Sequence, residues 1–230
     1  QSLFRIEAES GRRIVLALEP EPDCLCDRSD DVLKLFDESL NSLLNDASRP
    51  FLGVCLDLCH SAVLFDDAKT QIAKFAKCGI PVAKIQVSAA PKCRVTAESL
   101  AAMRDFLDPV YLHQTAVRDG AGVVHRFPDL APALEFCELR NFAESADCEL
   151  RTHFHVPLFC GEFVGGIRST ADGIDAELFS AVADAGVEQL EIETYSFGVL
   201  KPEFRPADVV DSVVGEFEWL KMRMIGGKES

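Results

Sequence analysis

Short apolar runs alternate along the chain with longer stretches in which apolar residues recur at helical spacing. The runs are almost continuously hydrophobic, which is typical of strands buried on both faces of a parallel sheet. We expect five such strands, at residues 14–20, 51–60, 82–90, 152–159 and 189–197. The helical stretches lie at residues 30–46, 67–79, 96–107, 128–142, 175–186 and 205–224.

Two further runs, at residues 110–117 and 123–128, are joined by an Asp-Gly turn and predict an antiparallel hairpin. Strand and helix in alternation predict an α/β fold with helices covering a parallel sheet. Five parallel strands are fewer than the eight of a complete (β/α)8 barrel, and a doubly wound sheet also fits this count. The hydrophobic pattern therefore leaves both architectures open.

The composition is that of a globular protein with a strong acidic bias. Of the 230 residues, 48% are hydrophobic and 27% are charged, and 23 basic against 38 acidic side chains give a net charge of −15. Such a surface repels phosphate backbones and anionic membranes, so we expect no nucleic-acid partner. No run approaches the roughly 20 apolar residues of a membrane span, so no span is expected either.

Nine cysteines are spread along the chain, several of them inside apolar runs. Their spacing matches neither a usual zinc finger nor a thioredoxin motif. We interpret them as small, reduced core residues. Since the first residues also lack the basic start and apolar core of a secretory signal, we expect a cytoplasmic protein.

The expected strands end in side chains that bind metals or move protons. In chain order these are Glu19, Asp57 with His60, Gln86, His153 with His155, and Glu191 with Glu193. The carboxyl ends of parallel strands meet at one edge of a sheet, so carboxylate oxygens and imidazole nitrogens would gather there. This is the ligand set of a divalent metal of the zinc, manganese or iron kind.

Each candidate also has a purely structural interpretation. Glu19 is a loop carboxylate in that case, Asp57 a strand-end cap, and His60 a surface histidine. The two histidines of the fourth strand would form a solvated face, and only one of Glu191 and Glu193 would face the site. The joint pattern over four strands favours the metal site. Tyr111 and His113 either border its pocket or belong to an ordinary hairpin.

Six segments carry a resemblance to known proteins: LALEPEP, GVCLDLCHSAVLF, KIQVSAA, VYLHQT, THFHVPLF and LEIETYSF, in this order across nearly the whole chain. With them the chain resembles the xylose isomerase-like TIM barrels of the sugar-phosphate isomerase/epimerase and endonuclease IV superfamily. Within this superfamily it is most similar to the EboE type of metabolite-traffic protein. CLDLCH and HFHVPLF are the most specific segments.

The resemblance implies a role for each strand-end residue. Glu19, Asp57, His60, His155 and Glu193 look like metal ligands, and His153 stands where the endonuclease branch has an aspartate. Gln86 stands where a histidine is common, and glutamine is a poorer metal ligand. By the same resemblance, Glu19 and Glu193 would exchange a proton with the substrate, and the metal would polarise a carbonyl or enediolate of that substrate. Gln86 and His113 remain as candidates for substrate contact.

The resemblance further implies that residues 1–230 form a single domain, the C-terminal half of a (β/α)8 barrel with a hairpin insertion. The first four strands would then lie upstream of Gln1 or in a partner, because a half barrel leaves two strand edges unpaired.

Three functions remain open. The first is a metal-dependent isomerase or epimerase acting on a small metabolite. The second is a protein that binds or escorts a metabolite without turnover, with partner proteins from a biosynthetic or transport cluster. The third, an endonuclease IV-like phosphodiesterase, is disfavoured by the net charge.

Overall fold

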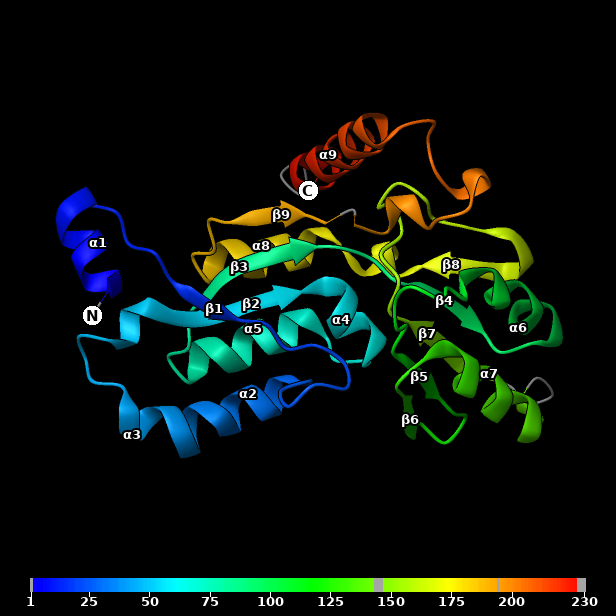
Figure 1. The fold of residues 1–230 in the computed structure, drawn as a ribbon, viewed down its shortest axis with the longest axis horizontal. Coiled ribbons are helices and arrows are strands. Elements are labelled where there is room, and N and C mark those ends of the chain that lie inside the picture. Colours follow the sequence, from blue (N-terminus) through cyan, green and yellow to red (C-terminus); the bar gives the residue numbers. More distant parts are fainter. Residues whose placement is uncertain (1, 143–146, 194, 227–230) are drawn as a thin grey trace.

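A computed structural model describes residues 2–142, 147–193 and 195–226 of the chain. It is a mixed α/β fold in which a parallel sheet and an antiparallel sheet lie next to each other along the longest axis (Figure 1). One hydrophobic core joins them, since Leu56 and Ile85 of the parallel sheet belong to the same buried cluster as Leu150 and Ile167 of the antiparallel sheet.

The parallel sheet confirms the α/β prediction. Its four strands are β1 (Leu16–Leu18), β2 (Leu52–Asp57), β3 (Val82–Val87) and β9 (Leu190–Ile192), in the order β1-β2-β3-β9. Every residue of β2 is buried, which explains its continuous apolar sequence. The carboxyl ends of these strands point toward the antiparallel sheet (Figure 1).

Helices follow the parallel strands in the expected order and form an outer layer in which each contacts the next (Figure 1). This layer consists of α2 (Ser29–Leu35), α5 (Ala68–Lys77), α8 (Ala176–Asp184) and α9 (Val209–Gly226). The stretch expected as one helix at 30–46 is divided into α2, a π-helical turn η1 (Phe36–Leu40) and α3 (Asn41–Leu43).

Two α-helices of the parallel half fall outside the expected stretches. The first, α1 (Ser2–Ser10), precedes the first strand, and the second, α4 (Leu58–Val63), begins directly after β2. The remaining short turns are η2 (Arg49–Phe51), η3 (Arg104–Phe106), η5 (Val164–Gly166), η6 (Thr170–Gly173), η7 (Tyr195–Gly198) and η8 (Pro202–Phe204).

The antiparallel sheet is larger than the expected hairpin. It contains β4 (Pro91–Arg94), β5 (Thr115–Arg118), β6 (Val124–Phe127), β7 (Glu149–Thr152) and β8 (Ile167–Ser169), in the order β6-β5-β7-β4-β8. The hairpin itself is confirmed as β5 and β6. Helices α6 (Ala97–Met103) and α7 (Leu130–Leu139) pack on this sheet (Figure 1).

The expectation of a parallel strand over residues 152–159 is wrong. The strand at this point is β7, which ends at Thr152 and pairs antiparallel with β4 and β5. Beyond it, the His153 amide donates to the carbonyl of Gln114 and the Val156 amide donates to the carbonyl of Ala89. Because these bonds reach two different segments, no continuous ladder forms, and the apolar run reflects burial rather than a strand.

The antiparallel sheet does not fit a TIM barrel, so the structure does not confirm the expected half barrel. All five antiparallel strands lie between β3 and β9 in the sequence. Within the described residues, no helix has both the length and the apolar composition that crossing a lipid bilayer requires.

Glu216, on α9, gives the first testable prediction. Its side chain is 2% exposed, and burial raises its pKa from 4.5 to about 8. The pKa of Glu216 is therefore higher in the folded protein than in the unfolded chain. The contribution of this group to the free energy of unfolding is fully present below about pH 4.5 and is lost as the pH rises through about 8.

We therefore expect Glu216→Gln to raise the free energy of unfolding at pH 8 by on the order of 3 kcal/mol, and to change it much less at pH 5. Urea unfolding of both proteins at the two pH values measures this difference. An equal effect of the substitution at pH 5 and pH 8 would contradict the assignment.

Candidate metal centre

Asp57 joins the end of β2 to the start of α4. Its Oδ1 accepts a 2.7 Å hydrogen bond from the His60 amide, so Asp57 is the N-cap of α4. Its Oδ2 accepts a 2.9 Å hydrogen bond from the Ser88 hydroxyl. The side chain is fully buried. The strand-end cap and the candidate ligand are therefore the same carboxylate, and the cap places His60 in the first turn of α4.

His60 is held by the loop after β1. Its Nδ1 lies 3.1 Å from the carbonyl oxygen of Pro20 and 3.5 Å from Oε1 of Glu19. A carbonyl can only accept, so Nδ1 of His60 carries the hydrogen and donates it. When the ring is neutral, its lone pair is then on Nε2.

His153 is fixed in the same tautomer by a different segment. Its Nδ1 donates a 2.7 Å hydrogen bond to Oε1 of Gln114, so its lone pair is also on Nε2. The two Nε2 atoms of His60 and His153 lie 3.1 Å apart, with the rings nearly perpendicular at 86°. These two ring nitrogens therefore lie at hydrogen-bond distance from each other.

His155 completes the imidazole group. Its ring centroid lies 5.3 Å from that of His153 and 6.0 Å from that of His60. Ligand atoms of Asp57, His60 and His155 all lie within 4.8 Å of one another. Burial, reinforced by the neighbouring imidazoles, holds the pKa of His153 well below its usual range, and burial lowers the pKa of His155 to about 4. Both rings are therefore neutral at pH 7, as metal binding requires.

Glu193 lies beside this group. Its Oε2 is 3.6 Å from Nδ1 of His155 and accepts a hydrogen bond from the side-chain amide of Gln86. Burial, together with the nearby charge of Asp57, raises the pKa of Glu193 to about 6. Burial also raises the pKa of Glu19, against the opposing effect of His60. Both carboxylates remain partly exposed, so a ligand can reach them.

Of the two carboxylates on the last strand, one faces the site. Glu191 is exposed and forms an ion pair with Lys84, whereas Glu193 points toward His155. This matches the interpretation in which one of the pair faces the pocket.

Gln86 and His113, the candidates for substrate contact, both lie near the imidazole group. The Cys55 thiol donates to Oε1 of Gln86 at 2.7 Å, which turns the amide nitrogen of Gln86 toward Glu193. His113 is 1% exposed, and its Nδ1 donates to the backbone carbonyl of His153 at 2.9 Å. His113 thus lies behind His153, and a direct contact with substrate stays a prediction for both residues.

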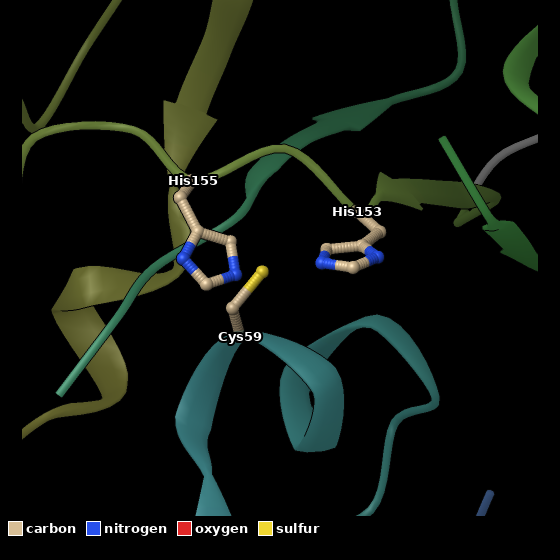
Figure 2. Close-up of side chains that lie close together, drawn as sticks. All are labelled: Cys59, His153 and His155. Carbon is tan, nitrogen blue, oxygen red and sulfur yellow. The ribbon is translucent and has the colours of Figure 1, made fainter. Parts of the chain in front are cut away.

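Two ligand-capable residues were not among the candidates from the sequence. The carboxylate of Glu21 lies within 4.8 Å of ligand atoms of His60 and His153, and the Cys59 thiol lies equally close to His153 and His155. Figure 2 shows this thiol, at the start of α4, directed toward the two imidazole rings. Burial raises the pKa of the Cys59 thiol well above its usual value, so the thiol is neutral at pH 7 in this environment.

The sequence contained a weak signal that Glu21 and Cys59 lie near the candidate ligands. Glu21 follows Glu19 by two residues, and Cys59 precedes His60 directly. The proximity to His153 and His155, however, arises only when the segment after β7 reaches α4.

Comparison with known proteins adds no further assignment: no family model, no curated protein and no solved structure matches this chain.

The geometry predicts that Asp57→Asn weakens zinc binding by at least about tenfold, since it removes the negative charge from the ligand group. Asparagine is also a good N-cap, so α4 should persist. The dissociation constant of zinc, measured by competition with a chelator, tests this.

Asp67→Asn is the matched control, because Asp67 caps α5 through a 2.8 Å bond from the Thr70 amide and is not part of the ligand group. Equal zinc affinities of the wild-type protein and both variants would exclude Asp57 as a ligand.

Proposed function

We propose that this chain binds one divalent transition metal through His60, His153, His155 and Asp57, and that it uses this centre to handle a small metabolite. The 3.1 Å contact between the Nε2 atoms of His60 and His153 carries the proposal. Two nitrogen ligands about 2.0–2.1 Å from one ion, at angles of about 95–110°, lie about 3.0–3.4 Å apart. The two Nε2 atoms are therefore already at the separation that a shared ion requires.

The donor set favours a particular class of metal. Three imidazoles and a carboxylate suit zinc, manganese or iron better than the oxygen-preferring calcium or magnesium. The hydrogen bonds from His60 to Pro20 and from His153 to Gln114 are the outer-sphere bonds that orient metal-binding histidines. When bound, such a metal supplies Lewis-acid polarisation of a carbonyl or hydroxyl oxygen.

The reaction best supported is isomerisation or epimerisation of a polyhydroxylated or phosphorylated compound. Glu19 and Glu193 both lie next to a metal-site histidine, and both are accessible to a ligand. A carboxyl with a pKa of about 6, as for Glu193, can accept and return a proton near neutral pH. We assign these two residues as the acid/base pair on either side of the substrate.

The order of the parallel strands supports a barrel origin for this site. Strands β1, β2, β3 and β9 pair in sequence order, and β4–β8 are inserted between the last two. We propose that the parallel sheet corresponds to four successive strands of a (β/α)8 barrel and that the antiparallel sheet is an insertion. The resemblance to the EboE type then suggests a place in metabolite traffic, with partner proteins.

A second candidate function is metabolite binding without turnover. The side-chain amide of Gln86 donates to Glu193, and the Cys55 thiol holds that amide in place. The hydrogen bond from Gln86 occupies a carboxylate oxygen of Glu193, one of the two residues of the proposed acid/base pair. An escort protein would retain the metal and the pocket while Glu193 serves only to orient a ligand.

Proton exchange with solvent separates the two functions. We expect the zinc- or manganese-loaded protein to introduce deuterium from D2O at the carbon next to the carbonyl of a sugar or sugar phosphate, as detected by mass spectrometry. Glu193→Gln should lower this rate by about 10²-fold or more, because the base is lost.

Glu191→Gln is the control on the same strand and should leave the rate unchanged, since Glu191 is exposed and faces Lys84. Equal rates in the two variants would refute the acid/base assignment. Binding of a sugar phosphate that requires the bound metal, without any deuterium incorporation, would favour the escort function instead.

A further inference from the structure

The solvent-facing side of the antiparallel sheet is rich in cations. Strand register places Arg126, Arg151, Lys92 and Arg168 in one row across the sheet, with Ala116 between the first two. Arg118 and Arg94 lie in the adjacent row, on either side of Glu149. Six of the 23 basic residues of a chain with a net charge of −15 therefore lie on one small face.

The carboxylates near this face neutralise it only in part. Glu149 accepts from Nη2 of Arg118 at 3.2 Å and from Nε of Arg151 at 2.6 Å. Asp172 accepts a hydrogen bond from Lys92. Arg126 pairs with Asp27, and Arg168 pairs with Glu162. Six cations thus share four carboxylates, whereas the chain as a whole has an excess of acids. An anion approaching this protein is drawn to this face.

A cavity of about 330 Å³ lies next to the cationic row, and its wall contains four cations, Lys92, Arg118, Arg151 and Lys69, and three carboxylates, Asp66, Asp67 and Asp172. Lys69 pairs with Glu177 at 2.9 Å and with Asp175 at 3.4 Å, outside this wall. The cavity wall includes the ring of Phe65, with the guanidinium carbons of Arg118 and Arg151 at 4.5 Å and 4.1 Å from the ring centroid. The side chains of Lys92 and Arg151 are only 19% and 18% exposed, so solvent screens their charges less than those of surface cations.

The arginines are held in place but retain capacity for a ligand. Nη1 of Arg151 donates to the carbonyl of Ala62 at 2.7 Å, which fixes the guanidinium at the end of α4. A guanidinium has five N–H groups, so the bonds to Ala62 and Glu149 account for part of its capacity. Ser61 and Thr170 also border the cavity.

This cavity is separate from the metal centre. Its lining includes Ser88, whose hydroxyl donates to Asp57, but among the described residues it includes none of the four proposed ligands. Leu58 and Ser61 of α4 form part of the same lining.

We propose that this cavity binds the phosphate group of a small phosphorylated metabolite, at a site distinct from the metal centre. A phosphate monoester carries up to two negative charges and offers three terminal oxygens, which match the forked donors of Arg118 and Arg151 and the point charges of Lys92 and Lys69. The volume is in the range of small-molecule sites. The proposal does not depend on the proposed metal or reaction.

The test uses the full chain after removal of metal with a chelator, titrated with glycerol 3-phosphate at low ionic strength in a calorimeter. We expect saturable binding that glycerol alone does not show and that weakens as salt is added. Arg151→Gln and Lys92→Gln should each weaken binding by about tenfold or more. Lys92→Arg should restore most of it, which separates a lost charge from a lost fold.

Arg126→Gln is the matched control, since it removes the same charge from the same row but lies outside the cavity lining. It should change affinity by less than about threefold. Absence of saturable binding to the wild-type protein, or an equal loss in Arg126→Gln and Arg151→Gln, would overturn the proposal.

His155→Ala separates this site from the metal centre. It should weaken zinc binding by at least about tenfold and leave glycerol 3-phosphate binding intact. Loss of phosphate binding in a folded His155→Ala protein would instead place the ligand at the metal centre and overturn the separate site.

Discussion

The contact between the Nε2 atoms of His60 and His153 is the constraint on which the rest of the site depends. The Nδ1 atom of each ring is bound to a fixed partner, Pro20 or Gln114, so the two Nε2 atoms are turned toward each other at 3.1 Å. Two imidazole nitrogens that bind one cation lie at about this separation. This is why we propose that the surrounding carboxylates belong to the same centre.

Both sheets are needed to make that contact. Asp57 ends a buried parallel strand and, by capping α4, places His60 in its first turn. His153 and His155 come from the opposite direction, on the segment that leaves the antiparallel strand β7. Ser88 ties the arrangement together, because its hydroxyl donates to Asp57 and accepts from the Cys59 amide. The centre therefore lies where the end of one sheet meets the other, and neither sheet alone contains it.

Local patterns in the sequence were sufficient for the four parallel strands and for most residues of the candidate metal centre. Strands β1, β2, β3 and β9 are short apolar runs, and Asp57, Gln86 and Glu193 follow from where those runs end. The antiparallel sheet beyond the β5–β6 hairpin was missed because its strands have three or four residues each and pair across long sequence separations. The run that contains His153 and His155 is apolar because it is buried, which periodicity cannot distinguish from a strand. Glu21 and Cys59 depend on tertiary contact and carry no reliable local signal.

The most direct test of the centre is X-ray absorption at the zinc edge of the zinc-loaded protein. We predict a first shell with imidazole nitrogens at about 2.0–2.1 Å, showing the outer-shell scattering of at least two histidine rings. His153→Ala should remove one ring from that signal. A spectrum without histidine scattering, or a protein that retains no zinc after dialysis, would contradict the assignment of these two facing Nε2 atoms to a shared metal.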